Sequence, residues 1–287
     1  MDRQPVPSEE EGLRLAADHE FIQHGLWELQ ELYELEFAEV HGMVIGLTHE
    51  ALKAQDVDVA LGYTTDGKIK EMDLVCLEDD KGFFGTNHPA PVLREEVLQV
   101  YPEVEDILES ISAQLDTDSL IQLNYQVDIE EMLPQEAAEN WLLEQGLLDG
   151  EPQEPRESQP VAIGSKEFVE QRILGQITLC ALRHAGIPVE DHTDLGGTQV
   201  NRMGLIKGKI HMYWEYTLKA WHDIHHQVEP GGDGDEVYQQ VRALDQPLGL
   251  LWLNYAPANS SMGLIMRAQD AEKREIRTIS DLAQYAP

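Results

Sequence analysis

The chain has 287 residues, which is enough for two lobes of roughly 100–150 residues or for one larger α/β domain. Its 20 lysines and arginines stand against 54 aspartates and glutamates, giving a net charge of -34. This balance disfavours nucleic-acid binding, because phosphate contacts need clustered basic side chains. The acid excess has two explanations that the sequence leaves open, a solvated surface and a high-salt habitat.

No apolar run approaches the ~20 residues that a membrane-spanning helix needs. The residues after Met1 lack the apolar stretch of a signal peptide. We therefore expect either a cytoplasmic protein or a chain that lacks its export signal or membrane anchor.

The first half of the chain alternates strand-like and helix-like hydrophobic patterns. It ends at residues 149–160, where three prolines and several charges replace any apolar periodicity, so this segment is predicted to be a linker. The chain thus divides into residues 1–148 and 161–287. The expected strands of the first half are 12–17, 37–40, 57–61 and 72–77, and its expected helices are 27–33, 48–54, 93–100, 104–115 and 134–145.

The second half shows the same alternation. Strands that alternate with helices favour α/β layering around a mainly parallel sheet. The expected strands are 161–164, 189–193, 210–214, 250–253 and 264–267, and the expected helices are 168–184, 198–207, 236–244 and one that begins at 280.

Two loops in the second half each connect a predicted strand to a predicted helix. Lys166 lies in the first loop and could attract a carboxylate. Gly197 and Thr198 lie in the second, where glycine lets the backbone approach a ligand and free N–H groups at a helix start favour an anion. Taken singly, each loop is explained better by an ordinary capped turn with a solvated lysine or a threonine cap.

Aromatic residues gather at the end of one predicted strand, where Tyr213, Trp214 and Tyr216 surround an acid. Aromatic faces attract cations, and quaternary ammonium groups above all. Core packing on alternate faces of a strand is an equally good explanation. In the first half, Tyr63 follows an apolar strand, at the edge where open α/β sheets bind ligands.

Metal and catalytic patterns are weak. His222, His225 and His226 share a helical spacing, but no acid or cysteine completes a coordination shell, so a solvated face is favoured over a metal site. The sequence contains no nucleophile elbow, phosphate-binding loop or zinc-protease motif. We expect neither an enzyme nor a cofactor.

Taken together, these segments resemble the osmoprotectant-binding proteins of ABC transporters, the glycine betaine/choline/carnitine group. The resemblance covers nearly the whole chain. Its motifs in the second half are residues 163–171, 195–198, 212–217 and 278–283, and those in the first half are 17–21, 46–52, 63–67, 77–82 and 123–125.

The order of the motifs differs from that of the family, which begins with the segments found here in 161–287 and continues with those found in 1–148. The resemblance therefore implies a circular permutation, with residues 161–287 as lobe one, 149–160 as linker and 1–148 as lobe two with a closing helix. Residues near Gly12 and Pro287 would then be neighbours. A slice of a tandem array, folding on itself or swapping halves in a dimer, is the alternative.

The resemblance implies a type II periplasmic binding protein-like fold, a clamshell in which two α/β lobes and a hinge enclose a small solute that passes to a membrane permease. It implies an extracytoplasmic location and a monomer or a half-swapped dimer.

The site residues are also carried over by resemblance. Lys166 and Gln171 would meet the polar end of the solute, with Gly197 and Thr198 on the same side, and Tyr216 and Tyr63 would be walls of an aromatic cage. At two positions where the family has tyrosines the chain carries His49 and, within residues 259–262, Met262. Trp27 or Trp214 could replace a lost wall.

The most concrete hypothesis is a transport protein that binds a quaternary-amine or zwitterionic solute. The alternatives are a sensor domain of the same fold and a binder of a different zwitterion such as ergothioneine.

Overall fold

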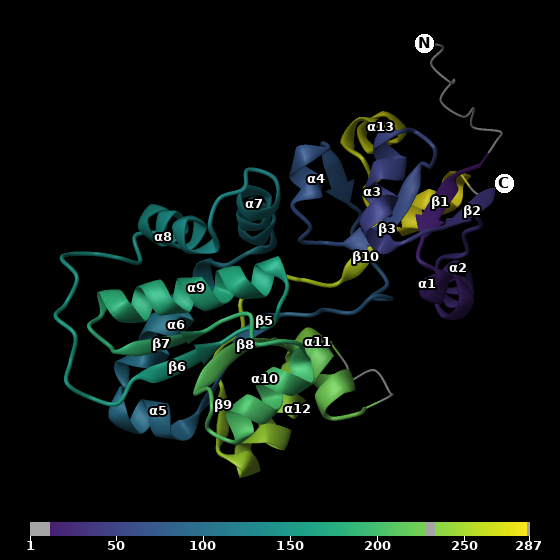
Figure 1. Ribbon diagram of the computed structural model, residues 1–287. Helices are drawn as coiled ribbons and strands as arrows, with labels where there is room; N and C mark the ends of the chain where they lie inside the picture. The colour runs from purple at the N-terminus through teal and green to yellow at the C-terminus, as the bar shows by residue number, and fades with distance from the viewer. Residues whose placement is uncertain (1–11, 228–232, 286–287) are drawn as a thin grey trace. The chain divides into compact units, whose positions relative to one another are not determined.

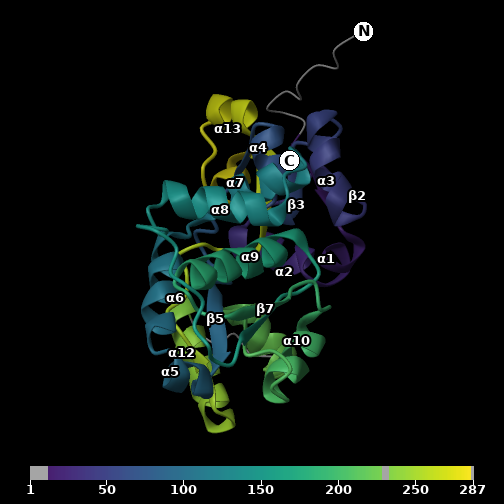
Figure 2. The ribbon, with the colours of Figure 1, turned by 60° about the vertical axis from the view of Figure 1, so that its left-hand side comes forward.

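The computed structural model describes residues 12–227 and 233–285. The described chain forms two compact units. Unit 1 contains the residues up to Phe84 and those from Ser261 onward, and unit 2 contains Gly85–Ser260 (Figures 1 and 2). The chain thus leaves unit 1 after Phe84 and returns to it after Ser260, so the division does not follow the linker at 149–160.

Unit 1 is built on a five-stranded sheet in the order β2-β1-β3-β10-β4. Strands β2, β1 and β3 are parallel, and β10 is antiparallel to both of its neighbours. The strands are β1 (Arg14–Ala17), β2 (Glu39–Gly42), β3 (Val59–Tyr63), β4 (Leu74–Cys76) and β10 (Met262–Arg267).

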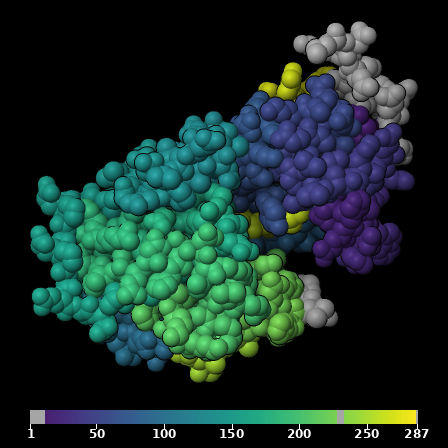
Figure 3. All heavy atoms as spheres, viewed as in Figure 1, coloured from purple at the N-terminus to yellow at the C-terminus, as the bar shows by residue number. Residues whose placement is uncertain are grey.

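The helices of unit 1 cover this sheet with leucine, isoleucine and aromatic side chains. One hydrophobic cluster contains Leu13 from the start of the described chain and Leu282 from its end. The C-terminal segment, yellow in Figure 3, lies against the blue surface of unit 1. The helices are α1 (His19–His24), α2 (Leu26–Tyr33), α3 (Ile45–Lys53), α4 (Lys68–Glu71) and α13 (Ala268–Arg274), with a 3-10 turn η3 (Ser280–Tyr285).

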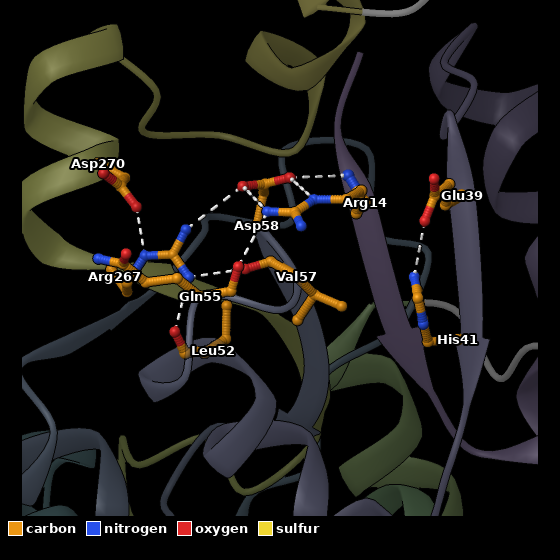
Figure 4. Close-up of polar contacts among 9 residues, drawn as sticks. All are labelled: Arg14, Glu39, His41, Leu52, Gln55, Val57, Asp58, Arg267 and Asp270. Atoms are coloured by element: carbon orange, nitrogen blue, oxygen red, sulfur yellow. Dashed lines mark hydrogen bonds and ion pairs between the residues drawn. The ribbon is translucent and has the colours of Figure 1, made fainter. Parts of the chain in front are cut away.

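A buried ion network joins the first and last strands of unit 1. Asp58 is 2% exposed and accepts hydrogen bonds from the Arg14 guanidinium on β1, at 2.9 and 3.1 Å, and from Arg267 on β10, at 3.3 Å (Figure 4). Arg267 also donates to the carbonyl oxygens of Leu52 and Val57, each at 2.6 Å. These hydrogen bonds, Arg14 above all, hold the pKa of Asp58 below its ordinary value even though burial alone would raise it.

We predict that Asp58→Asn lowers the free energy of unfolding by about 3–5 kcal/mol, because two guanidinium groups lose their shared carboxylate. Denaturant titration at pH 7 measures this loss. Asp56→Asn is the matched control, since Asp56 is an exposed acid in the same loop. Because the pKa of Asp58 is lower in the folded state, its contribution is present above the unfolded pKa and is lost as the pH falls through the folded value. Equal stability of the two variants would contradict the assignment.

Unit 2 has a second five-stranded sheet in the order β7-β6-β8-β5-β9. Strands β7, β6 and β8 are parallel, and β5 is antiparallel to β8 and to β9. The strands are β5 (Pro89–Arg94), β6 (Val161–Gly164), β7 (Val189–His192), β8 (Met212–Tyr216) and β9 (Leu250–Trp252).

The largest hydrophobic cluster of unit 2 is centred on the long helix α9, whose apolar side chains meet those of α6, α7 and α8. The helices are α5 (Glu95–Val100), α6 (Glu103–Gln114), α7 (Thr117–Asp128), α8 (Pro134–Glu144), α9 (Val169–His184), α10 (Thr198–Ile206), α11 (Thr217–Lys219) and α12 (Gly234–Asp245), with the π-helical turn η1 (Ala220–Ile224) and the 3-10 turn η2 (Gln246–Leu248).

The two sheets share one topology. In each, the first three positions hold the second, first and third parallel strands in chain order, the fourth holds an antiparallel strand, and the fifth holds the fourth strand. The antiparallel strand is β5 in unit 2 and β10 in unit 1. Each of them follows directly after the chain crosses between the units.

The expected strands are confirmed with shifts of a few residues, and so are most of the expected helices. Four of the five strands in each sheet run in one direction, as expected of a mainly parallel sheet, and one inserted antiparallel strand makes each sheet mixed. The expected helix 93–100 begins only at Glu95, since Arg94 ends β5. The expected helix from residue 280 is the 3-10 turn η3, and helices α1, α4, α7, α11 and α13 were not expected.

The predicted linker 149–160 has no helix or strand and is largely exposed, but it is bound to unit 2 at several points. Its backbone donates from Gln153 to His184 at 2.9 Å and from Arg156 to Gly186 at 3.0 Å. Arg156 also pairs with Glu103, and the Tyr101 hydroxyl donates to the Gln159 carbonyl at 2.8 Å. This segment therefore connects α8 to β6 along a defined path.

Across residues 12–227 and 233–285, the helices are too short or too polar to cross a membrane.

Candidate functional site

Two strand ends bring the main group of candidate residues together in unit 2. Strands β6 and β8 are parallel neighbours, so their carboxyl ends lie at the same edge of the sheet. Lys166 follows β6, and Tyr216 ends β8. Helix α9 begins beside them and contributes Gln171.

Lys166 is buried beside a carboxylate. Its ammonium group forms an ion pair with Glu215, and the two residues are 3% and 0% exposed. Glu215 also accepts from the Tyr213 hydroxyl at 3.1 Å and from the Tyr216 backbone at 2.8 Å. The carboxylate is therefore fully engaged, and the charge of Lys166 is balanced within the protein.

Tyr216 has two neighbours against its ring. The Lys166 ammonium lies 5.2 Å from the ring centroid, within cation–π range. The Phe168 ring stacks on it with centroids 6.2 Å apart, and Phe168 is 46% exposed. Tyr216 itself is only 3% exposed, and burial raises its pKa well above the ordinary value, so it stays a neutral phenol.

The Tyr216 hydroxyl donates to Glu170 at 2.5 Å. Glu170 is 4% exposed and also accepts from Asn124 and from Ser260, each at 2.9 Å. Gln171 follows on the same helix, is fully buried, and accepts from the Lys166 backbone at 3.3 Å. The start of α9 thus fixes both the loop that carries Lys166 and the oxygen of Tyr216.

Gly197 and Thr198 lie in a different place. They line a cavity of about 570 Å³ at the start of α10, together with Lys219, His222 and His226. Lys166, Gln171 and Tyr216 do not line it.

Helix α10, which begins at this cavity, is anchored by a buried ion pair. The Arg202 guanidinium binds Asp245 through both nitrogens, and the Trp252 indole donates to the same carboxylate at 2.8 Å. Although burial alone would raise it, hydrogen bonds with His225, Arg202 and Trp252 hold the pKa of Asp245 at about 2. His225 approaches Asp245 at 3.3 Å, so it is not part of a solvated histidine face. Within the described ranges, no group of three or more metal-ligating side chains forms.

Unit 1 brings together three further candidates. Tyr63 ends β3 and is 51% exposed, and Met262 pairs with it across the sheet on β10. His49 lies against the same strand, where Gly62 leaves room for its ring, and it is 1% exposed. Burial lowers the pKa of His49, which favours a neutral imidazole.

Trp214 does not join this set. It is 1% exposed, packs in the hydrophobic core of unit 2, and donates its indole N–H to Thr178 at 2.9 Å. Because side chains alternate along a strand, Trp214 points away from the face that Tyr213 and Glu215 share. It is removed from the candidate site.

Glu215, Glu170 and Phe168 were missed by sequence reasoning as site residues, although each lies inside a motif that was singled out. Glu170 could have been found from the sequence, since it is an acid four residues after Lys166 and lies on the apolar face of a long helix. An acid in that position must find buried donors.

We predict that Lys166→Met lowers the free energy of unfolding of the unliganded protein by about 3–5 kcal/mol, because Glu215 stays buried without its cation. Lys219→Met is the control, since Lys219 is half exposed and its ion pair with Asp223 contributes within about 1 kcal/mol. Denaturant unfolding gives both values, and a loss under about 1 kcal/mol for Lys166→Met would contradict the buried pair.

Comparison with known proteins identifies one family. The substrate-binding domain of ABC-type glycine betaine transport systems matches residues 10–144 and 159–287 as two separate stretches. This match confirms the resemblance drawn from the motifs and the type II periplasmic binding protein-like fold class, with two mixed α/β sheets.

Curated relatives match part of the chain. A glycine-betaine-binding protein of Pseudomonas aeruginosa is 41% identical over 138 residues, which is 47% of this chain and 44% of that protein. A carnitine transport binding protein of Listeria monocytogenes is 34% identical over 118 residues, 41% and 38% of the two chains. An ergothioneine transport permease and binding protein of Helicobacter pylori is 34% identical over 119 residues, 42% and 22% of the two chains. The match thus spans less than half of each relative.

A crystal structure of a glycine betaine/carnitine/choline ABC transporter aligns with 48% of this chain and 51% of its own, at 32% identity and a TM-score of 0.43.

Proposed function

Since the chain belongs to the family of substrate-binding domains of ABC-type glycine betaine transport systems, we propose that it binds a small quaternary-ammonium or zwitterionic solute for delivery to an ABC permease. The protein would act outside the cytoplasmic membrane and without catalysis. The observation that carries the proposal is the buried phenol of Tyr216, whose hydroxyl and ring face are both fixed by neighbours.

Tyr216 in unit 2 and Tyr63 in unit 1 are the proposed aromatic contacts of the solute. An aromatic face attracts a quaternary ammonium with about 0.5–2 kcal/mol. Lys166 and Gln171 are proposed for its polar end. The proposal keeps His49 and Met262 as contacts beside Tyr63, and Gly197 and Thr198 as contacts from the start of α10.

The solute class is broader than glycine betaine. The matched relatives bind glycine betaine, carnitine or ergothioneine by name, and each of these carries a quaternary ammonium and a carboxylate. A substitution such as His49 at a proposed wall changes the shape of the site, so we expect the preferred solute to be any small quaternary-ammonium or zwitterionic compound, choline included.

We further propose that the chain is a circular permutant of the family. Three observations support this: the family matches two separate stretches on either side of 149–160, both sheets keep one strand order, and both described ends of the chain lie in unit 1. Under this proposal, the family's first segment is 161–287, its later segment is 1–148, and 149–160 joins them.

We predict that a panel of betaine, choline, carnitine and ergothioneine contains at least one solute that raises the melting temperature by several degrees, since binding to the folded state stabilises by about 2.7 kcal/mol at one hundred times Kd. Tyr63→Ala lowers the affinity for that solute by roughly 2–30-fold, which corresponds to one lost cation–π contact. Leu32→Ala, another exposed apolar side chain of unit 1, leaves it unchanged. No shift with any solute would contradict the proposed function.

The permutation makes a separate prediction. A chain that begins at Val161, joins residue 287 directly to Met1 and ends at Leu148 folds with a melting temperature within a few degrees of the parent and binds the same solute. Circular dichroism and calorimetry measure both properties. A rearranged chain that aggregates or stays unfolded would contradict the permutation and leave the binding proposal standing.

A further inference from the structure

Glu170 is a buried carboxylate that three neutral groups hold. Its neighbours come from different parts of unit 2: the hydroxyl of Tyr216 at the end of β8, the amide of Asn124 on α7, and the hydroxyl of Ser260, the last residue before the chain returns to unit 1. Glu170 also lies in the first turn of α9, where the helix dipole favours a negative charge. All three hydrogen bonds run toward the carboxylate oxygens, so Glu170 acts here as an acceptor.

The buried charges around Glu170 do not cancel. Lys166 and Arg202 are the buried cations of unit 2 within the described residues, and they pair with Glu215 and Asp245. Each ion pair is neutral as a whole. Among the residues that the structure describes, no cation pairs with Glu170, so no buried ion pair neutralises its carboxylate.

The Tyr216 hydroxyl transmits that charge to the ring. A hydrogen bond from a phenol to a carboxylate is charge-assisted and shifts electron density toward the aromatic face. The same bond fixes the ring plane. A cation at the ring is therefore attracted more strongly than by a tyrosine whose hydroxyl is not bound to a carboxylate.

We propose that Glu170 is a positioning residue that acts through the Tyr216 hydroxyl to make this wall select a cation over a neutral molecule of the same shape. The inference rests on the proposed function, since it assumes that Tyr216 contacts the solute. It assigns the specificity for positive charge to a residue that does not itself touch the solute.

The test uses choline and 3,3-dimethylbutan-1-ol, which share one shape and differ in the charge of the central atom. Calorimetry or thermal shift at millimolar concentrations gives the affinity of the full chain for each. Glu170→Gln keeps the side-chain size and lowers the affinity for choline by about 10-fold, in line with the loss of one charge-assisted hydrogen bond. The affinity for the neutral alcohol changes by less than about twofold. A merely structural role would weaken both compounds alike.

Glu167→Gln is the matched control. Glu167 is an exposed acid in the loop before α9, so its replacement by glutamine removes the same formal charge from the same end of the helix. It changes choline binding by less than about twofold, because exposed charges are screened by solvent and salt. Equal losses in the two variants would overturn the inference.

A double-mutant cycle tests the route through Tyr216. Tyr216→Phe removes the hydroxyl and keeps the ring, so it lowers the affinity for choline selectively, as Glu170→Gln does. In the double variant, Glu170→Gln lowers the affinity for choline by less than a further twofold, approximately, because the route through the hydroxyl is already gone. Full additivity would overturn the inference. If Glu170→Gln does not fold, Tyr216→Phe alone decides, because equal losses for choline and the alcohol contradict a charge effect.

Failure of the inference and failure of the proposed function remain distinct. Wild-type protein that binds choline, with Glu170→Gln binding it equally well, overturns the inference alone. Wild-type protein that binds no quaternary ammonium or zwitterion overturns both.

Discussion

Each sheet of this protein depends on a strand that the chain supplies only after it has crossed from the other unit. The fourth position in unit 1 is filled by β10 and the fourth position in unit 2 by β5, and both run against their neighbours. Without that strand, the last parallel strand of either sheet would have no partner, and its backbone groups would lose their hydrogen bonds. Neither half of the sequence can therefore complete a sheet by itself.

This constraint explains why the ends of the chain lie where they do. The first strand of unit 1 and its inserted strand meet at Asp58, which binds Arg14 and Arg267 together. A buried carboxylate between two guanidiniums is costly to break, so strands β1 and β10 are fixed to each other through Asp58. The connection 149–160 is held on unit 2 by backbone hydrogen bonds and by the ion pair between Arg156 and Glu103. Termini that lie close together on a surface allow the relocation that the proposed permutation requires.

Much of the fold could be predicted from periodicity and turn residues, because most strands are short apolar runs followed by clear helix signals. Strand β5 could not, since Pro89 and Pro91 hide it, and its place in the sheet is set by contacts far away in sequence. Lys166 was singled out by its loop after a predicted strand and Tyr216 by its place at a strand end, and their roles toward a solute stay predictions. The acids that bind them are visible only after folding, because the sequence is rich in acids everywhere. Trp214 is not placed as a wall of the site, because the alternation of side chains along β8 directs it into the core of unit 2.

The chemistry of unit 2 follows from a few buried groups. Glu215 balances Lys166, Glu170 holds Tyr216, and Phe168 covers the ring from an exposed position. A crystal structure with bound choline tests the account most directly. The account predicts the trimethylammonium group within about 6 Å of the Tyr216 ring centroid. Choline bound instead in the cavity between Gly197 and His226, with Tyr216 uncontacted, would contradict it.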